Sequence, residues 1–138
     1  MLFRSRFGDP ETQVILPRLK TDLVKIMNAV IDEELENVEI KWYDNAAACV
    51  IMASGGYPGK YEKGFEITGL PDALQDPDVL VFHAGTEFKD NKYYTAGGRV
   101  LGITAVAENL DKAIEKAYAA VKLVNFRNCH YRKDIGVK

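Results

Sequence analysis

Hydrophobic and polar residues alternate along the chain in patterns that predict two kinds of element. The apolar runs at 46–53 and 100–107 are nearly continuous, which is typical of buried strands. Apolar residues spaced three and four apart predict helices at about 21–37 and 110–124. The order of helix, several strands and helix predicts an α+β fold, with a mostly antiparallel sheet and two principal helices.

Local signals set the ends of these predicted elements. Thr21 and Asn109 are placed to cap the two helices. An Asp-Asn dipeptide at 44–45 predicts a hairpin between a short strand at 40–43 and the first apolar run, and a second Asp-Asn at 90–91 predicts another hairpin after an extended segment at 79–88. The acidic residues that end the first helix are interpreted as a solvated face and not as a metal site.

Two glycine-rich stretches adjoin predicted buried strands. One spans 54–64 and contains four of the eleven glycines, and the other spans 97–102. Glycine allows a backbone to turn sharply or to approach a ligand closely. We therefore expect the two stretches to form one edge of a site, although two tight turns would show the same composition.

Composition narrows the classes of function. The 138 residues carry a formal net charge of -2, with both signs mixed along the chain, which argues against a nucleic-acid binder. The longest apolar run is far shorter than the roughly 18 residues of a membrane-spanning helix, so we expect no membrane partner. Cys49 and Cys129 lack the spacing of a metal or redox site, and free thiols in the cytoplasm are expected.

Charged side chains in irregular chain are the candidates for chemistry. Arg6, Asp9 and Glu11 lie within six residues, which indicates either a functional cluster or a salt-bridged turn. Arg99 lies beside glycines that would let an anion approach its guanidinium. No phosphate loop, dinucleotide fingerprint or His-Glu-x-x-His motif is present, and His83 and His130 are interpreted as hydrogen-bonded structural residues.

Six stretches closely resemble one family when they are taken together. They are Arg-Phe-Gly-Asp-Pro-Glu-Thr-Gln at 6–13, Met-Ala-Ser-Gly-Gly-Tyr-Pro-Gly at 52–59, Lys-Gly-Phe-Glu-Ile-Thr-Gly at 63–69, His-Ala-Gly-Thr at 83–86, Gly-Gly-Arg-Val-Leu at 97–101 and Tyr-Arg-Lys-Asp-Ile-Gly at 131–136. Their residues and their order along the chain resemble those of glycinamide ribonucleotide synthetase, also called phosphoribosylamine-glycine ligase. The resemblance extends over the whole chain from Arg6 onward.

The resemblance implies an ATP-grasp ligase of de novo purine synthesis. Such enzymes use ATP and Mg²⁺ to activate glycine as an acyl phosphate, which the amine of 5-phosphoribosylamine attacks. Only their C-terminal part is matched, so the resemblance makes 1–37 the end of the ATP-grasp domain and 38–138 the C-terminal α+β domain. The partners then implied are the missing amino-terminal and ATP-grasp domains and the two small substrates.

The resemblance also assigns roles to residues. Arg6 matches an arginine that can steady the acyl phosphate and the oxyanion, and it is the catalytic candidate. Asp9 and Glu11 fall at the ribonucleotide side, and Arg99 would bind the 5′-phosphate or the ribose. The loop at 55–64 would supply the neighbouring wall.

Within that loop, Tyr57, Lys60 and Lys63 are the candidate contacts to the substrate. The start of the chain departs from the family, because Leu2 and Arg4 stand where it carries the glutamate and asparagine that hold magnesium. Either the start is foreign sequence or the metal site has been lost. We assign no metal ligand, and we expect this chain alone to bind ATP and Mg²⁺ poorly and to be inactive.

Three functions are compatible with the residues and the resemblance. The first is the C-terminal part of the ligase, which contributes the ribonucleotide side of its site. The second is a non-catalytic binding or assembly module that docks onto a separate ATP-grasp partner. The third is a structural fragment without affinity for a ligand.

Overall fold

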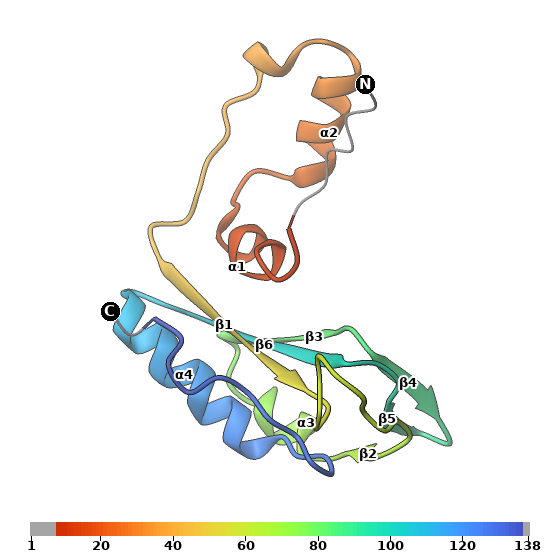
Figure 1. The fold of residues 1–138 in the computed structure, drawn as a ribbon. Coiled ribbons are helices and arrows are strands. Elements are labelled where there is room, and N and C mark those ends of the chain that lie inside the picture. The colour runs from red at the N-terminus through yellow and green to blue at the C-terminus, as the bar shows by residue number, and fades with distance from the viewer. Residues whose placement is uncertain (1–7, 137–138) are drawn as a thin grey trace.

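The computed structural model describes residues 8–136, so Leu2, Arg4 and the catalytic candidate Arg6 lie outside the described part. It is an α+β structure, as expected, in which all strand pairs are antiparallel. Helical segments near the N-terminus stand above a body of two small sheets and one long helix (Figure 1).

The body contains two three-stranded sheets. The first has the order β1-β6-β3, from Ala46–Ala53, Arg99–Ala107 and Val79–His83. The second has the order β2-β5-β4, from Glu66–Ile67, Lys92–Thr95 and Thr86–Lys89. The short helix α3 (Leu70–Ala73) precedes β3, and the long helix α4 (Leu110–Leu123) follows β6 along one face of the first sheet (Figure 1).

The core lies between the first sheet and α4. Val50 and Met52 of β1 pair with Ile103 and Leu101 of β6, and all four are at most 1% exposed. The buried face of α4 is built mainly from alanine, at Ala113, Ala117 and Ala120, with Val121 beside them. Small side chains let the helix axis approach the sheet closely, so this face of β1 and β6 is fully covered.

The opposite face of the first sheet is covered by the start of the described chain. Helix α1 (Thr12–Ile15) and the 3₁₀ turn η1 (Leu16–Arg18) pack on β1 and β6. The Thr104 hydroxyl donates to the main-chain oxygen of Gln13 at 3.0 Å and so ties α1 to β6. With both faces covered, β1 and β6 can be nearly all apolar, as the sequence predicts.

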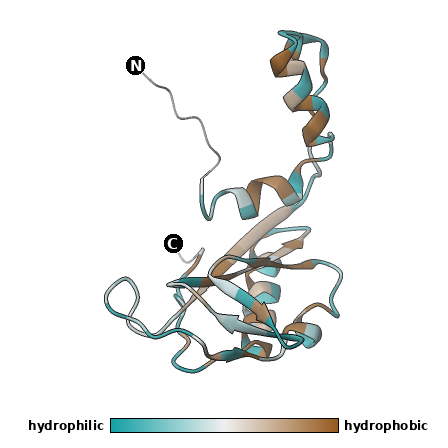
Figure 2. Ribbon diagram, turned by 90° about the vertical axis from the view of Figure 1, so that its right-hand side faces the viewer, coloured by the Kyte–Doolittle hydropathy of each residue, from teal (hydrophilic) through white to brown (hydrophobic). Residues whose placement is uncertain are grey.

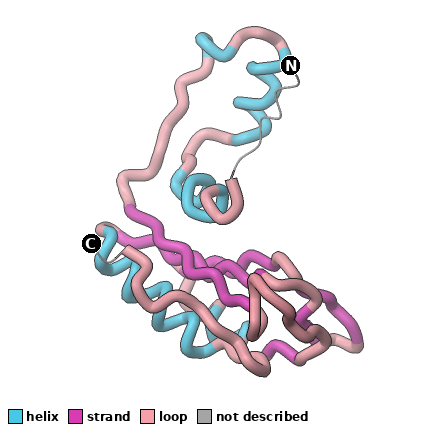
Figure 3. Tube along the Cα trace, in the orientation of Figure 1, coloured by secondary structure: helices cyan, strands magenta, loops and turns pink. Residues whose placement is uncertain are grey.

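The next segment, residues 20–45, projects away from the sheets and is called the arm. It contains α2 (Leu23–Ile31) and the 3₁₀ turn η2 (Leu35–Asn37), followed by an extended connection to β1 (Figure 3). Eight large apolar residues of the arm are between 41% and 76% exposed, and Figure 2 shows hydrophobic stretches on the projecting helix. We call them the arm surface: Val24, Met27, Val30, Ile31, Leu35, Ile40, Trp42 and Tyr43.

The predicted helix at 21–37 is wrong at both ends. The cap is Asp22, whose carboxylate accepts from the Lys25 amide at 2.9 Å, and the Thr21 hydroxyl instead accepts from the Lys41 amide at 2.7 Å. The helix ends at Ile31 because the chain turns at Glu33, which has a positive φ of 58°.

No helix in residues 8–136 is long and apolar enough to cross a membrane.

The first predicted hairpin is also wrong. Residues 40–43 form no ladder with β1, and Trp42 makes only an isolated bridge to Leu19. The partner of β1 is β6, whose long apolar run covers its full length. The second hairpin is confirmed, because Asp90 and Asn91 have φ values of 50° and 60° and turn β4 into β5.

The extended segment predicted at 79–88 is divided between the two sheets. It forms β3, bends at Ala84 and Gly85, and continues as β4. A side chain on Gly85 would meet the Gly97 Cα at 2.5 Å and the Arg99 carbonyl oxygen at 2.6 Å. The bend therefore depends on two backbones in direct contact, which only glycine permits.

Candidate functional site

The two glycine-rich stretches lie side by side in the structure. The Ser54 amide donates to the Gly98 carbonyl at 2.8 Å, and the Ser54 hydroxyl donates to the Gly97 carbonyl at 2.8 Å. Gly98 lies beneath the ring of Tyr57, since a Cβ built there would be 2.2 Å from the Tyr57 Cδ2. The stretches that the sequence marks as one site edge are thus joined through a buried serine and a packed tyrosine.

Arg99 and Asp9 form an ion pair across ninety positions of sequence. The Arg99 Nη2 donates to the Asp9 Oδ2 at 2.8 Å, and Nη1 donates to the Asp9 main-chain oxygen at 3.0 Å. The side-chain Nε2 of Gln13 also donates to the Asp9 Oδ1 at 3.2 Å. Because Asp9 accepts from both terminal nitrogens of the guanidinium and is itself held by Gln13 of α1, the pair favours one direction of the Arg99 side chain.

A pocket of about 320 Å³ opens beside this pair. It is lined by Ile51, Ala53, Tyr57, Arg99, His130, Tyr131 and Arg132, and we call it the Arg99 pocket. Its size is at the lower end of ligand sites. The two tyrosine rings offer flat walls, and the arginines and the histidine offer donors for an anion.

One wall of the pocket belongs to the C-terminal tail, residues 125–136. The main chain of His130 exchanges two hydrogen bonds with Ala53 of β1, at 2.9 and 3.0 Å. Arg132 then pairs with Asp134 through two hydrogen bonds, at 2.9 and 2.8 Å. These bonds from Arg132 lower the pKa of the Asp134 carboxyl, so the pair stays charged at neutral pH.

The structure brings together some of the predicted site residues and separates others. Asp9 contacts Arg99, and Tyr57 lines the same pocket. Glu11, Lys60 and Lys63 are exposed and do not line it, and the Lys63 ammonium lies 5.9 Å from the centre of the Tyr61 ring.

Sequence reasoning missed the two basic residues of the tail. His130 was interpreted as structural and Arg132 was given no role, because the tail has no periodic pattern that places it. The bridge between His130 and β1, which is formed through main-chain atoms, brings the start of this segment to the pocket. No side-chain signal encodes that bridge.

His83 lies away from the pocket, in a small aromatic cluster. Its Nδ1 lies 3.0 Å from the Thr86 hydroxyl, and its ring centre is 4.4 Å from that of Tyr93. Burial lowers the pKa of His83, which favours the neutral ring. A hydrogen-bonded structural residue fits this geometry.

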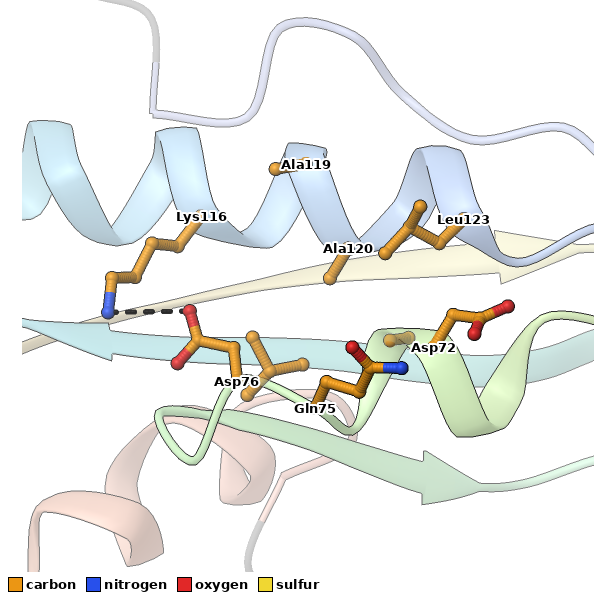
Figure 4. A pocket seen from close by; sticks show the side chains of 9 residues that line it. Asp72, Gln75, Asp76, Lys116, Ala119, Ala120 and Leu123 are labelled. Atoms are coloured by element: carbon orange, nitrogen blue, oxygen red, sulfur yellow. Dashed lines mark ion pairs between the residues drawn. The ribbon is translucent and has the colours of Figure 1, made fainter.

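A second pocket, of about 280 Å³, lies between α4 and the chain that follows α3 (Figure 4). Lys116 reaches across it to Asp76 at 3.5 Å and also to Asp78 at 2.5 Å. The hydrogen bond to Asp78 raises the pKa of Lys116, so the ammonium stays charged. This arrangement ties α4 to the loop before β3.

Comparison with known proteins decides the family. The family model described as "Phosphoribosylglycinamide synthetase, C domain" matches residues 47–138. The chain belongs to this family. The matched part of the phosphoribosylglycinamide synthetase C domain includes every residue that lines the Arg99 pocket, whereas Asp9 comes from the chain before it.

Relatives of the family come from bacteria and animals. A phosphoribosylamine--glycine ligase from Caldanaerobacter subterraneus is 50% identical over 96% of this chain, which covers 31% of the relative. A trifunctional purine biosynthetic protein adenosine-3 from Gallus gallus is 53% identical over 99% of this chain, which covers 14% of it. The chain therefore spans about a third of the ligase and about a seventh of the trifunctional protein.

A solved structure of the same family shows the same fold. The crystal structure of a phosphoribosylamine--glycine ligase from Thermotoga maritima matches with a TM-score of 0.73 and 36% sequence identity. The match covers 95% of this chain and 32% of that structure. It therefore includes most of the arm and α1 as well as the two sheets.

Proposed function

We propose that this chain is the C-terminal region of a phosphoribosylamine-glycine ligase and supplies the ribonucleotide side of its active site. The family and the names of the relatives support this proposal. The observation that carries it is the position of Arg99, which Asp9 holds at the edge of a pocket of ligand size. A phosphorylated aminosugar fits the chemistry of that pocket.

The role proposed for the pocket is to bind and orient the substrate. Arg99 contacts the phosphate or the ribose of 5-phosphoribosylamine, because a guanidinium matches the geometry of an oxyanion. Asp9 keeps the guanidinium in that position, and the ring of Tyr57 packs beside the sugar. Holding the amine in one orientation favours its attack on activated glycine.

ATP and Mg²⁺ are assigned to another part of the ligase. Within residues 8–136, no three His, Cys, Asp or Glu side chains converge to hold a metal ion. The described residues therefore do not fit a magnesium site, and Arg6 lies outside them. We propose that the nucleotide and the metal bind to parts of the ligase outside residues 8–136, and that this chain alone has no turnover.

The arm surface supports a partner for this chain. Its eight large apolar residues are each at least 41% exposed and lie within one projecting segment, and exposed apolar residues that are concentrated in this way mark interaction sites. We propose that the arm surface packs against the remaining part of the ligase, and that residues 1–37 are the end of its ATP-grasp domain. The same patch favours the second candidate function, an assembly module that docks onto a separate ATP-grasp protein.

A chimaera tests the proposed function. The C-terminal region of the Caldanaerobacter ligase is replaced by residues 6–138 of this chain, so that the ligase keeps its own residues at the positions of Leu2 and Arg4. Formation of ADP is measured with glycine and 5-phosphoribosylamine. The chimaera is expected to be active. Arg99→Ala should raise KM for 5-phosphoribosylamine roughly ten- to hundredfold, because it removes a charge-assisted contact, and should leave KM for ATP and glycine unchanged.

Arg127 provides a matched control for this substitution. It is an exposed arginine of the tail whose guanidinium lies 5.1 Å from the centre of the Phe65 ring, and it does not line the pocket. Arg127→Ala should leave all three KM values unchanged. Equal losses for all substrates in Arg99→Ala, or an inactive chimaera that is folded, would contradict the proposal. Activity of a mixture of this chain with the separate amino-terminal part would exclude the third candidate function, a structural fragment without affinity for a ligand.

A further inference from the structure

The C-terminal tail closes one side of the Arg99 pocket. His130, Tyr131 and Arg132 line the pocket on this side. Main-chain bonds between His130 and Ala53 fix where this wall begins. Without the tail, the side of the pocket next to Ala53 of β1 would be open.

The hydroxyl of Tyr118 on α4 fixes where the same wall ends. It donates to the main-chain oxygen of Arg132 at 2.9 Å and accepts from the amide of Ile135 at 3.0 Å. One hydroxyl thus holds two points of the tail that are three residues apart. Since Ile135 and Tyr131 also pack against the core, the tail between them has little freedom.

The charges of the wall suit an anion with more than one negative charge. Arg132 is held by Asp134 through its Nε and Nη2, and within the described part of the chain its Nη1 donates no hydrogen bond. Arg99 likewise uses Nη1 and Nη2 on Asp9, and among the described residues its Nε has no acceptor. Each guanidinium therefore keeps donors for a ligand.

We propose that the tail completes a phosphate subsite in the Arg99 pocket. Arg132 and His130 contact the phosphate group of a phosphorylated sugar, and Tyr118 acts as a positioning residue that holds Arg132 in place. This proposal rests on the proposed function. It adds contacts from the tail to those proposed for Arg99 and Tyr57.

The probe for this proposal is ribose 5-phosphate, and unphosphorylated ribose reports the contribution of the phosphate. Binding to the chimaeric ligase is measured by isothermal titration calorimetry. Arg132→Ala should weaken binding of ribose 5-phosphate about three- to tenfold, less than Arg99→Ala, because Arg132 is more exposed. Lys133→Ala removes the same charge at the neighbouring position, which does not line the pocket, and should change the affinity less than twofold.

A double-mutant cycle tests Tyr118. Tyr118→Phe keeps the ring and removes both hydrogen bonds to the tail, and it should weaken ribose 5-phosphate binding to a similar extent as Arg132→Ala. If Tyr118 acts through Arg132, the double variant should bind no more weakly than Arg132→Ala alone, whereas a merely structural role gives additive losses. The thermal midpoint of each variant shows that it is folded.

The outcomes separate this proposal from the proposed function. If Arg99→Ala weakens binding while Arg132→Ala and Tyr118→Phe match the wild type, the tail subsite is overturned and the proposed function stands. If the losses of the Tyr118 and Arg132 variants add, the positioning role is overturned. If an active chimaera shows no affinity for ribose 5-phosphate, or binds ribose equally well, the phosphate subsite is overturned.

Discussion

The wall of the Arg99 pocket leaves no room for a Cβ atom at Gly98. A Cβ at this position would lie 2.2 Å from the ring of Tyr57, which cannot move without leaving its place in the pocket wall. We expect Gly98→Ala to destabilise the chain by about 1–3 kcal/mol, as overpacking does. Urea denaturation of the variant measures this loss.

Gly59 in the neighbouring loop is the control for Gly98. The nearest atom to its added Cβ is the Gly56 carbonyl oxygen at 3.1 Å, so a small shift accommodates the methyl group. Gly59→Ala should cost clearly less than Gly98→Ala. Equal costs would show that the ring of Tyr57 does not limit position 98.

Cys49 makes stability depend on pH in one direction. Burial raises the pKa of its thiol, with a hydrogen bond to Thr104 opposing and the Asp9 carboxylate adding to the rise. The folded state therefore keeps this proton when the unfolded state releases it, so the stabilisation is present below the ordinary thiol pKa and is lost as pH rises above it.

We expect the Cys49 thiol to lower the free energy of unfolding as the pH rises above about 8.5. Tyrosine and lysine titrate near the same range, so the difference between wild type and Cys49→Ala is the quantity to follow. Denaturant titrations from neutral to alkaline pH measure it. A constant difference across that range would show that the thiol does not contribute.

At the scale of elements, the start of α4 is set by a local signal, the capping residue Asn109. The Asn109 side chain accepts a hydrogen bond from the Lys112 amide at 3.0 Å, as the sequence predicts. Asn109→Ala should destabilise the chain by about 1 kcal/mol, whereas Asn109→Asp, which keeps the acceptor, should be close to neutral. Thermal unfolding of both variants distinguishes the cap from a general effect of the position.

The elements that sequence reasoning found are those whose signals are local. The cap at Asn109 and the turn at 90–91 each determine their own backbone, and both are confirmed. The same kind of turn signal at 44–45 failed, because β1 pairs with β6 and is covered on both faces. Tertiary burial outweighed the preference of two residues.

In the candidate site, too, the sequence indicates the residues with a local signal but not the contacts between distant segments. Arg99 was visible because glycines surround it in the sequence, and Asp9 because it belongs to a charged cluster. Their contact depends on the packing of α1 against β1 and β6, and the wall that His130 and Arg132 form depends on a main-chain bridge between distant segments. A single sequence holds no periodic signal for such pairing.

At the scale of the whole molecule, the arm surface is exposed in this chain and is proposed to be buried in the complete ligase. Ile31 is 76% exposed here, so Ile31→Glu should change the unfolding free energy of this chain by less than about 0.5 kcal/mol. In the chimaera the same substitution would bury a charge and should cost several kcal/mol. Chemical denaturation of both proteins checks the two expectations.

Phe88 offers a control on a different surface. It is 59% exposed on β4 of the second sheet, outside the arm. Phe88→Glu should therefore have similar effects in the chain and in the chimaera. If Ile31→Glu is equally harmless in both, the arm surface is not the contact with the rest of the ligase.

The pairing of β1 with β6 has a consequence for biosynthesis. Ala46 is paired with Ala107, so the first apolar strand leaves the ribosome long before its partner exists. Until then its main-chain donors and acceptors are open to other strands, which makes the nascent chain prone to aggregation. Helix α4 follows β6 directly, so both the partner and the cover of β1 arrive late and together. Slower elongation just before β6 should lower the yield of folded protein, whereas a chaperone that shields β1 should restore it.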